Sequence, residues 1–541
     1  MWQHTYSPLA GSLPASALMA AIPIFVLLFL LAALRKPAWM AALSGLAAAA
    51  LVATVGYGMP VPLAISSVAY GAMFGLFPIG WVVFWAVVLY RLTLTTGKFE
   101  VLKDSVGGLT QDRRLQALLI AFAFGAFIEG AAGFGTPVAV AAAMLTGLGF
   151  SPFYAAGICL LANTAPVAFG SIGIPVITLA GITGLPLQDL SANVGRICAP
   201  VSLFVPAYLV LVMGGFKGLM GVLPAALLCG VAFAGMQFYV SNFLGPQLTD
   251  ILSSLAAIGV LVLLLRVWKP NGTFHLEGEH SAMQIKHHPS REVMLAWAPY
   301  LLLVILVLLW GVDVVKVGLN KGTVIFDWPS LHNLVQQVAP VVPKPTPYAA
   351  RFSLALLSAS GTACMVSVFL SAMVLGVSFG RLFGIIGETA KQLAFSMLTI
   401  ASVLGLAFLM NYSGATGTLG LAFAATGAAF PFFSALLGWL GVFLTGSDTS
   451  ANALFGNLQV VTAKALDLNP TLMAASNSSG GVMGKMISLQ SIAVAAAATG
   501  MKQGDEARLF RFTLRHSIFL ASVLGLIVLV YAYLAPTWVR G

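Results

Sequence analysis

The sequence predicts an all-α polytopic membrane protein with about twelve transmembrane helices plus two re-entrant hairpins. Of its 541 residues, 59% are hydrophobic and only 8% are charged, whereas about a quarter of the residues of soluble globular proteins are charged. Apolar stretches of the roughly 20 residues that a membrane-spanning helix needs recur along the whole chain. Two further apolar stretches are interrupted near their centres by glycine and polar residues. The sequence lacks the short alternating segments of an outer-membrane β-barrel.

The first three spans are predicted at about 15–34, 37–57 and 64–93. The stretch 15–34 lacks the basic lead and the small-residue cleavage site of a signal peptide, so we expect a retained helix. Because Arg35 and Lys36 follow this span and no Lys or Arg precedes it, the positive-inside rule places the amino terminus outside. The third span then descends to a cytoplasmic loop that contains Lys98, Lys103, Arg113 and Arg114.

Nine further spans complete the count, and the basic loops between them fall inside. These spans are expected at about 151–183, 189–214, 218–240, 246–267, 293–314, 351–378, 384–411, 470–500 and 512–536. The polar run 269–292 is then cytoplasmic, and 315–350 is the largest outer loop. Its prolines in "APVVPKPTP" favour a stiff surface excursion over a domain. The net charge of +10 lies in short loops between spans, a pattern that serves topology and not the binding of nucleic acid.

Two apolar stretches, about 115–149 and 431–468, are left outside this count and predict the re-entrant hairpins. Each is long enough for two short helices, and each is broken near its centre, by "EGAAGFGTP" in one and "TGSDTSAN" in the other. A single crossing by either stretch would move the later basic loops to the wrong side. An ordinary pair of spans is the open alternative, because a pair also returns to the side from which it started.

An internal repeat relates the two hairpin regions. The string "GAFIEG" parallels "GVFLTG", and "NTAPVAFG" parallels "NSSGGVMG", in the same order along the chain. The spacing also agrees, at 34 residues from Glu129 to Asn163 and 32 residues from Thr445 to Asn477. Ordered matches of this kind indicate a repeat better than single glycine matches do. Since the two hairpins enter from opposite sides in the predicted topology, the repeats are inverted.

The repeats divide the chain and locate a site. The parts are amino-terminal spans 1–57, a first repeat 58–214 with a broken helix about 151–183, linking spans and loops 215–350, a second repeat 351–511 with a broken helix about 470–500, and a carboxy-terminal span 512–541. Broken helices at corresponding places of inverted halves indicate a transporter's substrate site near the bilayer midplane. Non-helical backbone at that depth is tolerated only where it lines a cavity. Half-helix amino termini also direct partial positive charge at an anion.

Two carboxylates, Glu129 and Asp448, are the candidates for proton coupling. Both sit at hairpin breaks, and a charged side chain at the bilayer centre costs roughly 2.5 to 3.5 kcal/mol on insertion scales, so each is a functional candidate. No histidine lies in the middle of a predicted span. Burial favours the protonated form of a carboxyl group, which lets it load and unload a proton. The alternative for each is a structural acid that pairs with a neighbouring helix end or cation.

Short polar side chains at the breaks are the candidates for substrate binding. They are Asn163, Thr164, Ser447, Thr449, Asn477, Ser478 and Ser479. The alternative for each is that it joins helices by hydrogen bonds, as Ser, Thr and Asn commonly do in membranes.

Three cations are candidates to meet a substrate carboxylate. Lys485 ranks first because it lies eight residues past Asn477, about two helical turns, too deep to reach the interface easily. Arg196 ranks second, with the alternative that it extends to the outer interface. Lys391 ranks third, because it can pair with Glu388 three residues earlier on a helix.

At this point the chain resembles the bacterial L-lactate permeases, proton-coupled carriers of lactate and related 2-hydroxy acids such as glycolate. The likeness runs over nearly the whole length and is clearest in "FGAFIEGAAGFGTPVAV", "NTAPVAFG", "GWLGVFLTGSDTSANALF" and "GGVMGKMISLQSIA". It implies uptake of L-lactate, with D-lactate or glycolate, by proton symport across the bacterial cytoplasmic (inner) membrane. It also implies a relation to the wider ion-transporter group, with elevator-like movement of a transport domain against a scaffold.

The resemblance carries over to particular residues. The matching positions are Glu129, Gly130, Asn163, Thr164, Ser447, Asp448, Thr449, Asn477 and Lys485. One departure is Leu489, where the family's string usually has proline, and a less kinked helix is expected there. No cofactor is expected, and the coupling ion is a proton.

Other classes stay open as alternatives. An anion channel would use similar rings of polar backbone, and a sodium-coupled carboxylate carrier would share the anion site. A membrane-embedded enzyme is disfavoured, because Ser447 and Asp448 lack a partnering histidine and the four cysteines show no metal-ligand spacing. The expected partners are a small-molecule substrate and membrane lipid, with a homo-oligomer as an open alternative.

Overall fold

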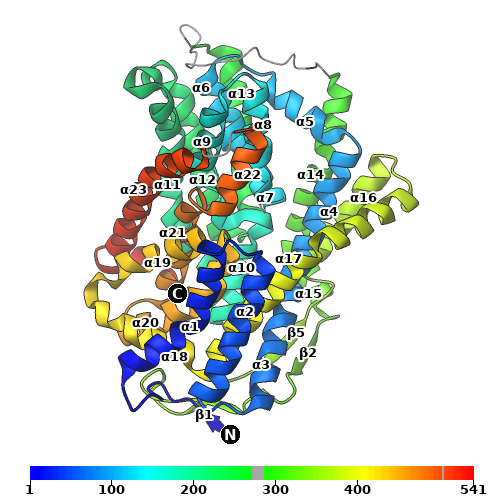
Figure 1. Cartoon of the computed structure of the whole chain (residues 1–541). Helices are drawn as coiled ribbons and strands as arrows, with labels where there is room; N and C mark the ends of the chain where they lie inside the picture. Colours follow the sequence, from blue (N-terminus) through cyan, green and yellow to red (C-terminus); the bar gives the residue numbers. More distant parts are fainter. Residues whose placement is uncertain (134, 271–273, 275–285, 287, 502–504) are drawn as a thin grey trace.

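The computed structural model describes the whole chain except residues 134, 271–273, 275–285, 287 and 502–504, and it is dominated by helices (Figure 1). Twelve helices in the described part are long and apolar enough to cross a membrane. A thirteenth candidate is the bent pair Pro152–Ala162 and Val167–Thr183, whose halves meet at 64°. The prediction of an all-helical, multi-pass membrane protein is therefore confirmed.

The amino-terminal region begins with two helices joined by a short basic turn. Its elements are α1 (Leu13–Ala32), α2 (Ala38–Leu51), η1 (Val52–Gly56), α3 (Val61–Phe74), η2 (Gly75–Gly80), α4 (Trp81–Thr95) and α5 (Lys98–Gly107). Proline precedes both α2 and α3, at Pro37 and Pro60, where its fixed φ favours a helix start. The long span from α3 to α4 is kinked at Phe77, which precedes Pro78 and has extended backbone angles, as expected before a proline.

The first half continues with a helical hairpin and a broken helix. The elements are α6 (Arg113–Gln116), η3 (Ala117–Phe124), α7 (Gly125–Ala131), α8 (Thr136–Gly147), α9 (Pro152–Ala162), η4 (Val167–Phe169) and α10 (Gly170–Thr183). Helix α8 turns back and packs against η3 and α7, so the stretch predicted at about 115–149 is a hairpin. Four helices follow, namely α11 (Leu187–Gly221), α12 (Leu223–Phe243), α13 (Thr249–Val267) and α14 (Ser290–Gly311).

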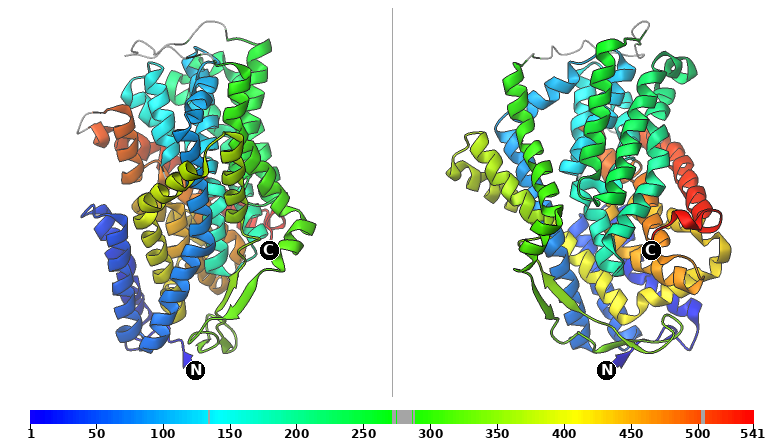
Figure 2. Two further views of the ribbon diagram at one scale, coloured as in Figure 1. Left: turned by 90° about the vertical axis from the view of Figure 1, so that its right-hand side faces the viewer. Right: turned by 180° about the vertical axis from the view of Figure 1, so that it is seen from behind.

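The stretch predicted as an outer loop, 315–350, contains regular structure that the sequence did not predict. Helix α15 (Asp313–Asn320) leads into β2 (Val324–Asp327), β3 (Val335–Gln337), β4 (Thr346–Pro347) and β5 (Arg351–Leu354). Strand β1 (Trp2–Gln3) pairs parallel to β3, β3 pairs with β4, and β2 pairs antiparallel to β5. These strands lie beside the amino terminus at one end of the molecule (Figure 2).

The amino-terminal segment is fixed to this strand region and to the helix behind it. His4 is buried, and one ring nitrogen lies 2.9 Å from the backbone oxygen of Tyr412. Burial lowers the pKa of His4 to about 4, so its ring is neutral at physiological pH.

The second half repeats the plan of the first. It contains α16 (Ser360–Val374), α17 (Phe379–Ser413), α18 (Ala415–Phe423), η5 (Ala424–Ala429), α19 (Phe430–Thr445), α20 (Asp448–Ala465), α21 (Pro470–Lys485), α22 (Leu489–Thr499), α23 (Asp505–Tyr533) and η6 (Pro536–Trp538). Helices α19 and α20 pack against each other and form the hairpin predicted at about 431–468.

One predicted span differs from the structure. The stretch 351–378 begins as strand β5 and contains only the 15-residue helix α16, which is shorter than the 18-residue length required of a candidate span. Its apolar composition had suggested one continuous helix. The strand forms because Arg351–Leu354 pairs with Val324–Asp327, a tertiary contact that local hydropathy does not reveal.

The two halves pack on each other reciprocally. Helix α10 of the first half packs on α20 of the second, and α22 of the second packs on α8 of the first. In the same way α11 packs on α21, and α23 packs on α9. In Figure 1 the pair α9–α10 descends and the pair α21–α22 ascends. This exchange of equivalent contacts with opposite direction is the relation expected of inverted repeats.

Candidate functional site

A cavity of about 70 Å³ lies where the hairpins and broken helices of the two halves meet. A cavity of this size has room for several water molecules. The described residues that line it are Glu129, Val167, Gly170, Ser171, Ile174, Pro175, Gly446, Ser447, Asp448, Thr449, Lys485 and Gln490. Segments more than 300 residues apart in the sequence therefore build one site.

Glu129 reaches the cavity from α7, the last part of the first hairpin's first arm. Its side chain is 5% exposed, and Oε2 has no hydrogen-bond partner among the described residues. Gly170 lies so close that a Cβ there would be 2.6 Å from Glu129 Oε1. Only glycine leaves room for the carboxyl group at this point.

The broken helix of the first half forms the facing wall through an irregular backbone. Ser171, Ile172 and Gly173 have φ values of 47°, 60° and 75°, a left-handed conformation that residues other than glycine rarely adopt. The Oγ of Ser171 donates a 3.1 Å hydrogen bond to the backbone oxygen of Ala132 at the first hairpin's tip. The break therefore begins at the predicted Asn163 but extends ten residues further, and it is joined to the hairpin.

The tip of the second hairpin brings Asp448 to the opposite wall. Gly446 has a φ of 72° and ends α19, and the side chain of Ser447 caps the amino terminus of α20. Asp448 is the first residue of α20 and is 4% exposed. Its Oδ2 accepts hydrogen bonds from Ser478 Oγ at 2.6 Å and from Asn452 Nδ2 at 3.3 Å, while Oδ1 has no partner among the described residues.

A chain of amide side chains extends this hydrogen bonding away from the cavity. Asn477 Nδ2 donates to Asn452 Oδ1 at 2.9 Å, and Asn477 Oδ1 accepts from Gln459 Nε2 at 3.0 Å. Asn452 Nδ2 also lies 3.1 Å from the backbone oxygen of Pro175 in α10. The network thus fixes the second hairpin to both broken helices.

Lys485 is the only basic residue among the described residues that line the cavity. It is 8% exposed, and its Nζ donates a 2.6 Å hydrogen bond to the backbone oxygen of Gly446. It interacts electrostatically with both Glu129 and Asp448. No direct ion pair joins Lys485 to either described carboxylate. One buried cation therefore lies near two buried acids and is committed to neither.

Three helices begin at the cavity. The cavity-lining residues Ile174, Thr449 and Gln490 lie in the first turns of α10, α20 and α22. The amino terminus of a helix has free backbone N–H groups and partial positive charge. Together with Lys485, these termini make a setting that suits a small anion.

Five predicted site residues come together in this cavity, and the others lie around it. The cavity-lining five are Glu129, Ser447, Asp448, Thr449 and Lys485. The others pack just outside, with Ser478 bonded to Asp448 and Asn477 in the amide network.

Four more predicted residues of this surrounding layer differ in their bonding. Asn163 lies next to Glu129, but neither polar atom of its side chain has a hydrogen-bond partner among the described residues. Thr164 Oγ1 donates to the backbone of its own helix at Leu161. Ser479 is buried with an unpartnered Oγ in the described part of the chain. Gly130 is buried beside α13.

Arg196 and Lys391 do not reach the cavity. Arg196 donates to Asn242 Oδ1 at 2.8 Å and packs its guanidinium over the ring of Trp538 at 5.3 Å. Lys391 is exposed on α17, and the Glu388 that we expected as its partner pairs instead with Arg91 at 3.0 Å.

The second helix break lies elsewhere than predicted. We expected it at Asn477, but α21 runs without interruption to Lys485, and the break covers residues 486–488. The whole stretch Pro470–Thr499 counts as one span and is not among the pairs bent by more than 40°. A modest bend agrees with the expectation drawn from Leu489.

The reason lies in the matched strings of the two repeats. In the first copy Pro166 lacks the N–H that a continuing helix needs. The second copy has Gly480 at that place, where a Cβ would lie 1.9 Å from the backbone oxygen of Ala435 in α19. This glycine permits close helix packing, and α21 continues through it.

Sequence reasoning missed three polar residues. Ser171 and Gln490 line the cavity, and their positions a few residues beyond each predicted break were the available signal. Asp250 in the first turn of α13 is 1% exposed and interacts electrostatically with Glu129. Its signal was a carboxylate just inside a predicted span, 246–267.

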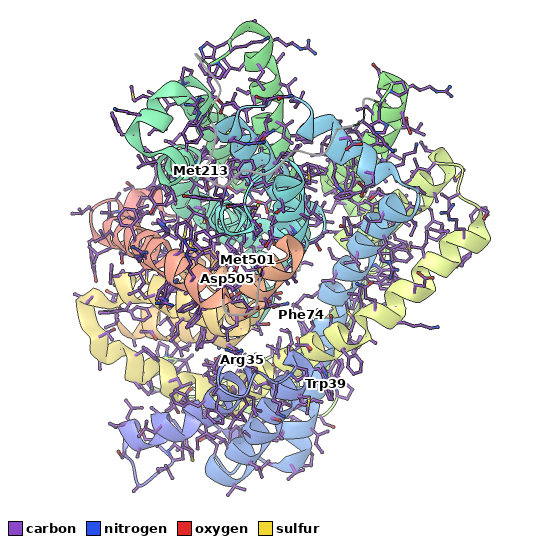
Figure 3. All side chains as sticks on the ribbon, turned by 45° about the horizontal axis from the view of Figure 1, so that its top comes forward. Arg35, Trp39, Phe74, Met213, Met501 and Asp505 are labelled. Carbon is purple, nitrogen blue, oxygen red and sulfur yellow. The ribbon has the colours of Figure 1, made fainter. Side chains whose placement is uncertain are left out.

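A larger cavity of about 850 Å³ adjoins the site. We call it the vestibule. It is lined by Leu31, Arg35, Lys36, Ala38, Phe443, Leu444, Thr445, Gly446, Leu489, Gln490, Ile492, Ala493, Glu506, Ala507, Phe510 and Arg511. Gly446 and Gln490 line both cavities, so they separate the site from the vestibule. Figure 3 shows Arg35 opposite the start of α23 near Asp505.

The fold and the site together define a multi-pass membrane transport protein, with a buried polar cavity between interrupted helices of two inverted halves. The chain belongs to the L-lactate permease family, whose sequence profile matches residues 16–535.

Named relatives agree with this assignment. The chain is 46% identical to an L-lactate permease of Bacillus subtilis (strain 168), over 99% of this chain and 100% of that protein. It is 45% identical to the glycolate permease GlcA of Escherichia coli (strain K12), over 98% of each chain. Among solved structures, it is similar to the YdaH transporter of Alcanivorax borkumensis with a TM-score of 0.44 and 15% identity, over 86% of each chain, a likeness too distant to carry a functional argument.

Proposed function

We propose that this protein takes up L-lactate, and also D-lactate or glycolate, by symport with protons across the bacterial cytoplasmic membrane. The names of its relatives support this substrate class, because proteins 43–46% identical over nearly the whole chain are called L-lactate permease or glycolate permease. The structural observation that carries the proposal is Lys485, a buried cation near two carboxyl groups that forms a direct ion pair with neither described acid.

The substrate carboxylate binds at Lys485. Its oxygens accept hydrogen bonds from Lys485 Nζ, which now donates to the Gly446 carbonyl, and from free N–H groups at the start of α20. Charge-assisted bonds of this kind are roughly twice as strong as neutral ones. The 2-hydroxyl group of the substrate then lies within reach of the hydroxyl side chains of Ser447 and Thr449, which also line the cavity.

Substrate binding makes proton uptake favourable. When a substrate anion pairs with Lys485, the two carboxyl groups lose their shared cation, and the buried site gains a negative charge that is costly in a low dielectric. A proton on Glu129 removes that charge. Glu129 is the favoured acceptor, because Asp448 Oδ2 accepts two hydrogen bonds and such bonds favour the ionised form, whereas Glu129 Oε2 accepts none from the described residues.

The vestibule is the route between the site and one side of the membrane. It lies between the α1–α2 turn and the group formed by α19, α22 and α23. We expect this side to be cytoplasmic, because Arg35 and Lys36 follow the positive-inside rule. Alternate exposure of the site follows from an elevator-like movement of the hairpins and broken helices relative to α1–α4 and α17.

Uptake into proteoliposomes tests the proposal. An inward pH gradient in sodium-free buffer is expected to drive accumulation of labelled lactate above its external concentration, and unlabelled glycolate is expected to compete. Equilibration without accumulation would indicate a channel, and accumulation that requires sodium would indicate a sodium-coupled carrier. Either result would contradict proton symport.

A further inference from the structure

Asp250 is a buried carboxyl group that the account so far does not use. It lies in the first turn of α13 and is 1% exposed. Neither Oδ1 nor Oδ2 has a hydrogen-bond partner among the described residues. A buried acid without donors is rare, because nearly all buried polar side chains are hydrogen-bonded. This side chain therefore calls for a ligand or a proton.

Asp250 packs directly against the hairpin that carries Glu129. A Cβ on Gly130 would lie 2.8 Å from Asp250 Cβ, so α7 and α13 touch at this residue. Glu129 is the charged group whose electrostatic interaction with Asp250 is resolved. The thiol of Cys198 on α11 also faces Asp250.

No cation compensates Asp250. The other elements packed against α13 are α10, α12 and η3, and their sequences contain no Asp, Glu, Lys, Arg or His. Lys485 interacts with Glu129 and Asp448, whereas its interaction with Asp250 is not resolved. A bare buried carboxylate costs several kcal/mol, so Asp250 is neutral and carries a proton while the site is closed.

Two opposing influences make this proton exchangeable. Burial favours the neutral acid, whereas the amino terminus of α13 favours a negative charge in its first turn. Admission of water to the site weakens the first influence and leaves the second. Two neighbouring carboxyl groups also resist simultaneous ionisation, so Glu129 and Asp250 titrate as a pair.

We propose that Asp250 and Glu129 form a two-carboxyl proton site between α13 and the first hairpin, and that the coupling proton is loaded onto and released from this pair. Loading adds one proton to one carboxylate oxygen of the pair, and release returns it to water on the other side. The proposal rests on the proposed symport and names a second residue that carries it out.

The test compares two transport modes of Asp250→Asn. Asparagine imitates the protonated acid in shape and charge but cannot release a proton. Exchange of internal for external lactate needs no net proton movement, so counterflow in proteoliposomes is expected to stay within about twofold of wild type. Accumulation driven by a pH gradient is expected to fall at least tenfold. Asp189→Asn, at the first turn of α11 but only half-buried, is the matched control and is expected to keep both modes.

Three results would overturn the proposal. One is normal accumulation by Asp250→Asn, and a second is loss of accumulation together with counterflow in a protein that elutes as a single species. The third uses infrared spectroscopy of the purified protein, where wild type is expected to show a protonated-carboxyl band at neutral pH that Asp250→Asn lacks; an unchanged band contradicts the assignment even if the variant is inactive. If wild type itself shows no lactate counterflow, the proposed function fails and not the role of Asp250.

Discussion

The two halves of the molecule share one architecture but treat their buried polar groups differently. In the second half Asp448, Asn452, Asn477 and Gln459 bond to one another in a continuous network. In the first half the equivalent Asn163 has no side-chain hydrogen bond to the described residues. Glu129 and Asp250 likewise present oxygens that accept none from that part of the chain.

This difference indicates a division of labour. A satisfied buried network makes a structure rigid and specific, whereas unsatisfied polar groups are costly. Their retention beside a cavity is typical of groups that bind a ligand or carry a proton. We infer that the second half holds the shape of the site, while the first half exchanges protons.

Removal of Lys485 has the largest expected effect, because this cation serves both halves. Lys485→Ala leaves two acids beside a site that must accept an anion. Loss of one partner of a buried charge pair costs about 3–5 kcal/mol, so we expect lactate uptake to fall on the order of 100-fold or more in both counterflow and accumulation. Lys391→Ala, on the exposed face of α17, is the control. Near-normal kinetics of Lys485→Ala would remove this residue from the site.

The matched asparagines of the repeats give the next largest effect and a direct comparison of the halves. Asn477→Ala deprives Asn452 Oδ1 and Gln459 Nε2 of a partner, at about 1–3 kcal/mol for each buried group left unpaired. Asn163→Ala breaks no side-chain hydrogen bond to a described residue. Thermal unfolding in detergent is therefore expected to shift to lower temperature for Asn477→Ala only. Equal shifts would show that the halves do not differ in this way.

The vestibule gives the smallest expected effect. Arg35 and Lys36 line it and raise the local concentration of anions without touching the site. Removal of both charges is expected to raise KM a few-fold at low ionic strength, with the difference disappearing near 1 M salt, where the Debye length is about 3 Å. A change in maximal rate with no change in KM would argue against this role. Uptake kinetics at two salt concentrations distinguish these results.

The spans and hairpins could be predicted because each depends on local composition. Membrane-spanning helices require long apolar runs, and the glycines and polar residues of "EGAAGFGTP" and "TGSDTSAN" interrupt such runs visibly. The strands β2 to β5 could not be predicted in the same way. They are short, and β3 pairs with residues 2–3 at the opposite end of the sequence.

The site was predictable in its residue types but not in its detail. Lys485 and the two hairpin acids follow from the rule that charge at membrane depth is functional. The break at Asn477 was not correctly predicted, because "NSSGGVMG" looks like a helix breaker and its glycines in fact allow α21 to approach α19. Asp250 was missed since its significance arises only from its contact with Gly130, 120 residues away.

The measurement that tests this account most directly compares Glu129→Gln with Asp448→Asn in the same proteoliposomes, with both lactate counterflow and pH-driven accumulation recorded. We predict that Glu129→Gln keeps counterflow and loses accumulation, because it can bind substrate but cannot release a proton. Asp448→Asn is predicted to impair both modes together, because it disturbs the network that shapes the site. Accumulation by Glu129→Gln at the wild-type level, or uncoupling by Asp448→Asn instead, would contradict the assignment of proton transfer to the first half.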